Sequence, residues 1–558
     1  MRTTHNKIVA IGTLLTVGVP YGTKAAEKSD DQRPNIIYIL TDDQPYSLLG
    51  CTGHPIVQTP NIDRLAAEGV LFTNAHVSSA ISTPSRTCML TGRFERNHGV
   101  NFNSGTSLSP EAWRECYPMV LRDNGYYTGY VGKNHTPIGE TGYKSGLMDS
   151  SFDYWYAGHE HLSFYPKNIH SIFKNAKADT QVEIIEEGMM DFLSPNERNL
   201  EGAKHFLSSR PEGQPFFLNL CFNLPHGNGT KSMKMLESDP EIYRTLYRDQ
   251  EIPLPEFYIA RDEIITPKLP AELLHAEDRQ NIYDYVDNPE DLRELNIREM
   301  EAVTGIDILV GNLVDELKRQ KLDKNTVIIF CADHGIMNGE FGLGGKSLCY
   351  ELCTHVPLIV YDPRAPKSQR KAVNDELVLS IDISKSILDY ASVEAPASYQ
   401  GESFKEMLDG EKESLREYLF TENLWSTQFG NPRCESVQDK EWKYIRYYKN
   451  ENISALDRAR QIKAMKLPGN TIYKTNMTDV ITYRIFAEAR LNGEEPVYEE
   501  LFNLKNDPKE STNLAGSNIH SELLIKMREE CDKQLRFARG EGAPRVCIDV
   551  PDYVVIPK

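Results

Sequence analysis

Four short apolar runs constrain the fold of this chain more than any other feature of its sequence. They are rich in β-branched and aromatic residues, and they comprise Asn35–Leu40, Tyr126–Val131, Pro215–Phe222 and Thr326–Cys331. Continuous apolar runs of this length are typical of parallel strands that are buried on both faces. The sequence therefore predicts an α/β fold, with a large mixed, mainly parallel sheet between layers of helices.

Helical patterns lie between these runs. Thr59-Pro60-Asn61 is a helix start, and the apolar residues after it recur at the spacing of one buried face. A longer amphipathic helix precedes the last run, with an apolar stripe made of Met300, Val303, Ile306, Val310, Leu313 and Leu317. Between His226 and this long helix we expect an irregular acidic insertion, roughly Asn228 to Asn296, near the functional face.

Each of the four strand-like runs is followed within a few residues by side chains that can carry chemistry. These are Asp42 and Asp43, Lys133 and His135, His226, and Asp333 and His334. One such group could be an ordinary surface turn. Because open α/β sheets bind ligands at the carboxyl ends of their strands, four groups together favour one shared crevice.

The last part of the chain has a different pattern. Short aromatic runs such as Trp442–Tyr447 alternate with turns, and the segment Leu523–Phe537 has a helical pattern. This predicts a small C-terminal antiparallel sheet with one packed helix. We expect three parts: a signal peptide over residues 1–25, a catalytic α/β domain over 26–410, and a C-terminal subdomain over 411–558.

The start of the chain resembles a secretory signal peptide. Arg2 and Lys7 precede the apolar run Ile8–Val19, and small residues surround the expected cut. A dozen apolar residues are too few to span a bilayer, so no membrane anchor is expected. These features predict a periplasmic or secreted protein.

The charge of the chain limits its partners. The 558 residues carry a formal charge of −19, and removal of Arg2, Lys7 and Lys24 with the signal peptide would change it to −22. This acidic balance argues against nucleic acid or an anionic membrane as a partner. Ten cysteines are too sparse for a disulfide scaffold, and a bridge or two after export is all we expect.

One motif narrows the chemistry. Ser82-Thr83-Pro84-Ser85-Arg86 continues to Thr91-Gly92-Arg93, the pattern S-x-P-S-R-x-x-x-x-T-G-R. This pattern resembles the signature of the type I sulfatases of the alkaline phosphatase superfamily. The resemblance extends through Thr59–Leu65, Gly132–His135 and Leu501–Leu504, in the family's order. In that family the first residue of the motif is oxidised to formylglycine, so the resemblance implies a Ser-type bacterial enzyme that carries formylglycine at residue 82.

The resemblance also implies roles for individual residues. One divalent cation, expected to be Ca²⁺, would be held by Asp42, Asp43, Asp333 and His334, with the hydrated residue 82 as a further ligand. Arg86 and Lys133 would hold and polarise the hydrate, and His135 would take its proton. His226 and Lys346 would bind the sulfate oxygens, and one of them would protonate the leaving alcohol. His334 stands where many relatives carry Asn, so another metal stays open.

The chemistry of sulfate ester cleavage explains these residue types. Negative charge builds on the sulfate oxygens and on the departing oxygen, and a cation with Arg and Lys stabilises the first while a proton donor stabilises the second. An unmodified Ser would end as a stable sulfate ester, whereas a hydrated aldehyde can expel sulfate as its carbonyl re-forms.

We therefore expect an exported sulfatase that acts on a sugar of a sulfated glycan, of glycosaminoglycan or mucin type. Its partners would be the sulfated carbohydrate and a maturase that forms formylglycine before export. The aromatic segment Tyr154-Trp155-Tyr156 could contact the sugar or belong to the core. Two alternatives remain: a phosphonate or phosphate ester hydrolase of the same superfamily, and a catalytically dead glycan-binding protein.

Overall fold

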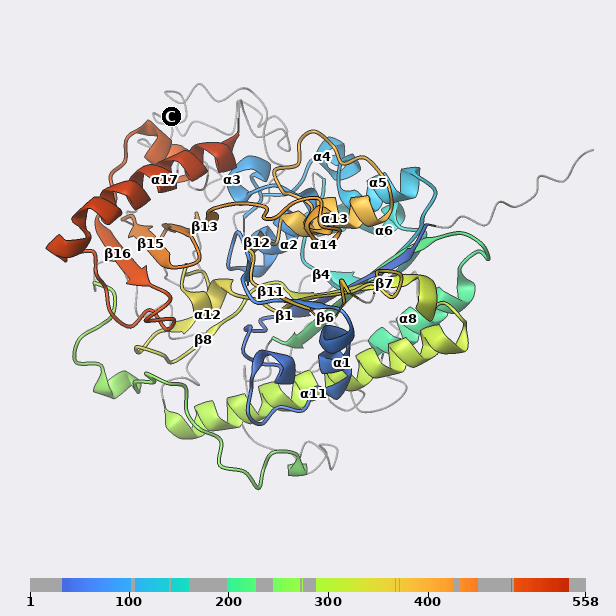
Figure 1. Cartoon of the computed structure of the whole chain (residues 1–558), viewed down its shortest axis with the longest axis horizontal. Coiled ribbons are helices and arrows are strands. Elements are labelled where there is room, and N and C mark those ends of the chain that lie inside the picture. Colours follow the sequence, from blue (N-terminus) through green and yellow to red (C-terminus); the bar gives the residue numbers. More distant parts are fainter. Residues whose placement is uncertain are drawn as a thin grey trace, which may run out of the picture.

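An eight-stranded sheet forms the centre of the computed structural model (Figure 1), with the strand order β11-β2-β10-β7-β1-β6-β4-β5. The structure describes residues 33–101, 106–139, 142–159, 198–226, 244–270, 273, 288–366, 368–370, 372–424, 432–449, 483 and 486–540. Strand β10 is antiparallel to both its neighbours, and the other pairs are parallel. The expected large mixed, mainly parallel sheet is confirmed.

The four predicted strands are the four adjacent strands in the middle of this sheet. They are β1 (Asn35–Asp42), β4 (Tyr127–Asn134), β6 (Phe216–Pro225) and β7 (Thr326–Ala332). The sheet is completed by β2 (Val70–Phe72), β5 (Tyr154–His159), β10 (Leu358–Tyr361) and β11 (Ala372–Asn374). Two small pairs flank it, β3 (Ala75–His76) with β12 (Val378–Leu379) and β8 (Met337–Asn338) with β9 (Gly344–Gly345).

The sheet separates two apolar layers, because successive side chains of a strand point to opposite faces. In β1, Ile36, Tyr38 and Leu40 enter one buried cluster, while Ile37 and Ile39 enter the other. The second layer is closed by α1 (Pro60–Glu68), α8 (Arg198–Ser209) and α11 (Pro289–Arg319), which lie together on one side in Figure 1. Burial on both faces explains why these strands have continuous apolar runs.

Shorter helices cover the first layer, on the opposite side of the sheet in Figure 1. They are α2 (Ser82–Thr91), α5 (Tyr117–Asp123), α13 (Asp382–Tyr390) and α14 (Phe404–Leu408). There are four further short helices: α3 (Glu95–His98), α4 (Pro110–Arg114), α6 (Leu147–Ser151) and α12 (Glu351–Thr354).

Helix α11 is longer than the sequence pattern indicated. Asn288 caps it by accepting a hydrogen bond from the Asp291 N–H, and Pro289 occupies its first turn, so the helix is already formed at residues assigned to an irregular insertion. The prediction that the insertion extends over residues 289–296 was therefore wrong. Much of the remainder, including residues 227–243, lies outside the described part of the chain.

A four-stranded antiparallel sheet follows the main sheet in sequence, as expected. It has the order β13 (Leu419–Asn423), β14 (Cys434–Gln438), β15 (Trp442–Tyr447), β16 (Tyr498–Asn503), and α17 (Ser521–Arg539) packs on it (Figure 1). Ile445, Tyr447 and Phe502 belong to the same buried cluster as Ile36 of the main sheet. The two sheets therefore share one core, and the domain boundary at residue 410 remains a prediction.

A buried ion-pair network joins helix α3 to the small sheet and to α17. Arg96 of α3 donates from Nε to Glu422 of β13 at 2.9 Å and also bonds Glu435 of β14. Glu435 in turn accepts from Arg446 Nε at 2.8 Å, and Arg446 pairs with Asp532 of α17 at 2.7 Å. The guanidinium of Arg96 is fully buried, so its charge depends on these carboxylates.

Glu95, beside this network, gives a pH-dependent prediction. Burial and the nearby Glu422 raise the pKa of Glu95 to about 8, so its side chain is protonated in the fold at neutral pH. The unfolded chain releases that proton near pH 4.5, so this group stabilises the fold fully below that pH and loses its effect as the pH rises toward 8. We expect Glu95→Gln to flatten the fall in melting temperature between pH 5 and pH 8, as measured by calorimetry. Parallel curves for both proteins would contradict this assignment.

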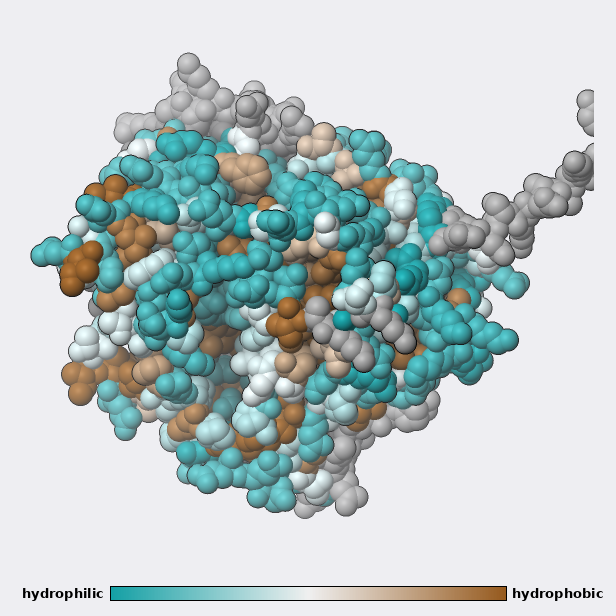
Figure 2. Space-filling model, viewed as in Figure 1, coloured by the Kyte–Doolittle hydropathy of each residue, from teal (hydrophilic) through white to brown (hydrophobic). Residues whose placement is uncertain are grey.

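The described surface is largely polar, in agreement with the 26% of charged residues in the sequence. The face in Figure 2 is mostly hydrophilic, with hydrophobic side chains in small scattered groups. Among the described residues, no helix combines the length and apolar character needed to cross a bilayer.

The nine described cysteines are unbridged, and Cys349 and Cys434, with their sulfur atoms 3.5 Å apart, lie in contact in the core.

Candidate active site

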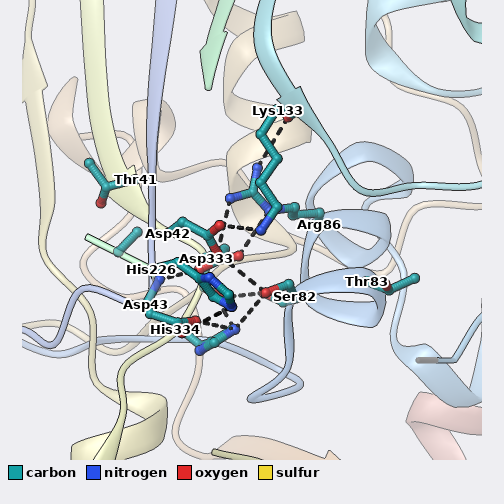
Figure 3. Close-up of polar contacts among 12 residues, drawn as sticks. Thr41, Asp42, Asp43, Ser82, Thr83, Arg86, Lys133, His226, Asp333 and His334 are labelled. Carbon is teal, nitrogen blue, oxygen red and sulfur yellow. Dashed lines mark hydrogen bonds and ion pairs between the residues drawn. The ribbon is translucent and has the colours of Figure 1, made fainter. Parts of the chain in front are cut away.

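Ser82 lies beside a buried polar cluster (Figure 3). It is the first residue of α2, a helix in which every residue is buried, and it is only 1% exposed. Its hydroxyl oxygen lies 3.0 Å from Nε2 of His334 and 3.3 Å from Oδ1 of Asp42. The positive end of the helix dipole favours negative charge at this position.

Three carboxylates and one imidazole converge beside Ser82. Ligand atoms of Asp42, Asp43, Asp333 and His334 all lie within 4.8 Å of one another, and all four residues are buried. They come from the ends of β1 and β7, which are adjacent in the sheet. These are the four residues that the sequence predicted as metal ligands, and the structure brings them together with Ser82.

The backbone explains how two consecutive carboxylates reach one site. Side chains of neighbouring strand residues point to opposite faces, but Asp43 has a φ of 59° and so leaves the strand geometry. Asp tolerates this left-handed conformation better than most residues. The Asp43 N–H donates to Oδ1 of Asp333 at 3.0 Å, which fixes the turn against the end of β7.

Three cations face these three carboxylates. Lys133 contacts Asp42, Arg86 donates from Nε to Asp333 at 2.8 Å, and Lys346 donates to the two oxygens of Asp43 at 2.8 and 2.9 Å. Lys133 projects from β4 just after Gly132, where φ is 98° and a Cβ would lie 1.9 Å from a backbone oxygen. The three side-chain cations nearly balance the negative charge of the three carboxylates. A bound divalent cation would therefore make the pocket positive overall.

The two adjacent carboxylates differ in their pKa values. Burial acts to raise the pKa of Asp42, but Lys133 and Arg86 hold it well below its usual range. Burial raises the pKa of Asp43, against the opposing effect of Lys346. Burial also lowers the pKa of Lys133, although Asp42 opposes this shift. Asp42 is therefore the firmly ionised member of the pair.

His334 is oriented as a nitrogen ligand. Its Nδ1 lies 2.9 Å from the carbonyl oxygen of Gly335, to which it can donate only if Nδ1 carries the proton. Its Nε2 then presents a lone pair toward Ser82 and lies 3.2 Å from Asp43. Outer hydrogen bonds of this kind fix the tautomer of histidines that bind metals.

The two other predicted histidines lie at different distances from the cluster. His226, directly after β6, places Nε2 3.6 Å from Oδ2 of Asp43, and its side chain is 12% exposed. His135, directly after β4, is buried with its ring 6.4 Å from the ring of Tyr143. No contact between His135 and Ser82 is found in the described structure.

Sequence reasoning missed one buried group in this site. Gln44, next to Asp43, is fully buried, and neither its amide oxygen nor its amide nitrogen has a partner among the described residues. The only feature of the sequence that could have indicated Gln44 is its position directly after Asp42 and Asp43. Tyr154, Trp155 and Tyr156 form the buried strand β5, so sugar contact by this segment was wrong and the core alternative is correct.

The fold and the site together define a class of hydrolase. The site combines a serine at a helix N-terminus, a buried carboxylate cluster and several cations, which are groups that hydrolysis of an anionic ester can use. Comparison with known proteins then identifies the family.

The family model for sulfatases matches residues 34–393, and a second model, for the C-terminal part of N-sulphoglucosamine sulphohydrolase, matches residues 339–489. The chain belongs to the sulfatase family, and it is a sulfuric ester hydrolase.

Individual relatives agree with this membership. The chain is 26% identical to an N-acetylglucosamine-6-O-sulfatase of Bacteroides thetaiotaomicron, over 76% of this chain and 80% of the relative. It is 24% identical to an arylsulfatase of Clostridium perfringens, over 91% and 96%.

Solved structures share the fold. One, of a protein in complex with its substrate D-glucosamine-2-N,6-O-disulfate, has a TM-score of 0.65 at 21% identity and covers 92% of this chain and 99% of its own. A phosphonate monoester hydrolase of Agrobacterium radiobacter has a TM-score of 0.62 at 20% identity, with 90% and 96% covered.

Proposed function

We propose that this protein is an exported sulfatase that hydrolyses an O-sulfate ester on a sugar of a sulfated glycan, through a formylglycine derived from Ser82. The observation that carries the proposal is the contact of Ser82 with Asp42 and His334, two members of the buried cluster of candidate metal ligands. The names of the relatives, which include glycan sulfatases, support a sulfated sugar as the substrate, and we propose a glycan of glycosaminoglycan or mucin type.

The modified residue would supply the nucleophile. Hydrated formylglycine carries two hydroxyl groups, one to attack the sulfur and one whose deprotonation expels sulfate as the carbonyl re-forms. Arg86 and Lys133, both buried beside Asp42, would hold this group in place. His135 would take the second proton.

The four ligand residues fit a hard divalent cation. Three carboxylates suit Ca²⁺, and the oriented Nε2 of His334 completes a set of four around Ser82. When bound, such a cation would neutralise charge that develops on the sulfate oxygens. The residues that would hold it are Asp42, Asp43, Asp333, His334 and the modified residue 82.

Removal of divalent cations should therefore weaken both activity and stability. We expect EDTA to lower the rate by about 10²-fold or more, because several kcal/mol of transition-state stabilisation are lost. The melting temperature should fall by a few degrees, since a cation that binds only the folded state stabilises it. Assays after re-addition of Ca²⁺, Mg²⁺ or Mn²⁺ measure selectivity. Full activity in a protein shown by elemental analysis to contain no metal would contradict the assignment.

His226 is better suited than Lys346 to donate a proton to the leaving alcohol. His226 is the more exposed of the two, whereas Lys346 is tied to both oxygens of Asp43. We expect His226→Ala to slow hydrolysis of a sugar sulfate by about 10²-fold, because the alcohol leaves poorly without a proton. An aryl sulfate, whose phenolate leaves readily, should lose less than about tenfold. Equal losses on both substrates would assign His226 to sulfate binding instead.

The burial of Ser82 bears on its maturation. Only 1% of this residue is exposed, so an oxidising enzyme cannot reach it in the folded protein. We therefore infer that the maturase acts on the unfolded chain, before export to the periplasm or the medium. The signal peptide on which export depends lies outside the described residues and stays a prediction.

The mass of the tryptic peptide Leu65–Arg86, from protein made in its own host, tests the mechanism directly. Loss of two hydrogens at Ser82 is the expected result. An unmodified Ser82 in active protein would overturn the formylglycine mechanism. Release of sulfate from a panel of sulfated sugars then tests the substrate class.

A second candidate is a phosphonate or phosphate monoester hydrolase. The observation that favours this candidate is the fold shared with the phosphonate monoester hydrolase of Agrobacterium radiobacter. Turnover of matched aryl sulfate, phosphate and phosphonate esters separates the two. A third, a glycan-binding protein without catalysis, predicts binding of sulfated glycan with no release of sulfate.

A further inference from the structure

A cavity of about 240 Å³ opens beside the active site. Pro45 and Ile336 are part of its wall, and they follow Asp43 and His334 by two residues each. Because two residues span at most about 7 Å, this wall begins immediately next to the proposed metal ligands. The opposite wall is the N-terminal half of α11. A sugar whose sulfate ester lies at Ser82 would have this cavity as a neighbour.

Asn338 provides an unused hydrogen-bond acceptor in this cavity. It lies in β8 opposite Gly344, two residues before Lys346, and it is 8% exposed. Its Nδ2 donates to Oε2 of Glu299 at 3.2 Å, and its backbone N–H donates to Glu340 at 2.6 Å. Its Oδ1 is buried and has no partner among the described residues. Buried acceptors are nearly always paired, so this oxygen is available to an N–H or O–H group of a ligand or of water.

The two glutamates beside Asn338 are suited to a neutral ligand. Burial is the main cause that raises the pKa of Glu299 to about 8 and that of Glu340 to about 7. A protonated carboxyl group donates a hydrogen bond, and the same burial disfavours an anionic group of a ligand at this place. The rest of the wall is largely apolar, with Leu48 and Met300 among its residues. Glu256 and Lys509, of opposite charge, lie at its exposed rim.

We propose that this cavity binds the acetamido group of an N-acetylhexosamine that carries the sulfate ester, with Asn338, Glu299 and Glu340 as residues that determine specificity. The acetamido N–H donates to Oδ1 of Asn338, its carbonyl oxygen accepts from a glutamic acid, and its methyl group lies against the apolar wall. An N-sulfo group in the same place would bury its negative charge beside Asn338, Glu299 and Glu340, none of which is a cation, and is rejected. This inference rests on the proposed function, whose substrate it narrows.

Binding to a protein that cannot turn over tests the inference separately from catalysis. The full chain with Ser82→Ala, loaded with Ca²⁺, is titrated with O-sulfated N-acetylhexosamines and with their N-sulfo counterparts, and saturation-transfer NMR follows the acetyl methyl protons. We expect the N-acetyl sugar to bind at least about tenfold more tightly than the N-sulfo sugar. Adding Asn338→Leu should reduce that preference to less than about threefold and should weaken saturation of the methyl signal.

Matched variants control for folding. Asn124→Leu makes the same chemical change at an exposed position at the end of α5 and should leave the preference intact. Asn338→Ala, checked by its melting temperature, replaces Asn338→Leu if the larger side chain does not fold. Equal binding of the two sugars, no binding of either, or a preference that survives both Asn338 variants overturns the inference. Sulfate release by active protein is measured separately, so a failed sulfatase assay with intact N-acetyl selectivity would count against the proposed function alone.

Discussion

Ser82→Ala should abolish catalysis while the protein remains folded. We expect the rate to fall by about 10⁴- to 10⁶-fold on aryl and sugar sulfates, because the variant cannot form the nucleophile on which the other groups act. The lost contacts are to Asp42 and His334 at 3.3 and 3.0 Å, so the buried cluster around them is otherwise intact. Steady-state assays and a melting curve measure the two effects separately.

Thr83→Ala is the matched control for this experiment. Thr83 is the next residue of α2 and is also buried, but its side chain points away from Asp42 and His334 in Figure 3. Its loss should change the rate by less than about tenfold. Wild-type protein from a host without the maturation system should resemble Ser82→Ala. Retention of more than a hundredth of the wild-type rate by Ser82→Ala would exclude residue 82 as the nucleophile.

Arg96→Met should cause the largest loss of stability among single changes away from the site. Methionine has a similar reach, but it leaves Glu422 and Glu435 buried without the guanidinium that pairs with both. Breaking a buried ion pair by removing one partner costs about 3–5 kcal/mol, most of it from the charge left behind. Urea denaturation of the two proteins, followed by circular dichroism, measures the difference in the free energy of unfolding.

Arg528→Met is the matched control for this change. Arg528 pairs with Glu499 on the surface of α17, with its side chain 46% exposed, and exposed pairs contribute less than about 1 kcal/mol. The Arg96→Met loss should also shrink at acid pH, where Glu422 and Glu435 accept protons. A loss below 1 kcal/mol that does not vary with pH would show that the network contributes no net stability.

The central fold was predictable because its signal is local. Each of β1, β4, β6 and β7 is buried on both faces, so its own residues had to be apolar without interruption. The short outer strands have no such signal: β11 has three residues and is paired only on one side, with β2. For the start of strand β5 the sequence left two alternatives open, sugar contact and core, because aromatic residues occur in both.

The candidate site was predictable for the same reason, since its residues stand where apolar strands end. The carboxyl ends of parallel strands meet at one edge, so Asp42 and Asp333 could be brought together without knowledge of the loops. The pairing of Arg96 with Glu422 joins residues 326 positions apart and depends on how the second sheet docks. Likewise, the facing of Glu299 and Asn338 arises only from packing of α11 against β8.

The shared core of the two sheets has a consequence for any engineering of this enzyme. Ile445 and Phe502 of the small sheet complete the same apolar layer that supports β1, and β1 carries Asp42. The catalytic part therefore cannot be produced as a separate module, because truncation before β13 would expose that layer to solvent. Recombination between relatives should exchange surface loops and leave both sheets from one parent. The chain should also unfold in one cooperative step, with no intermediate in which the small sheet has detached.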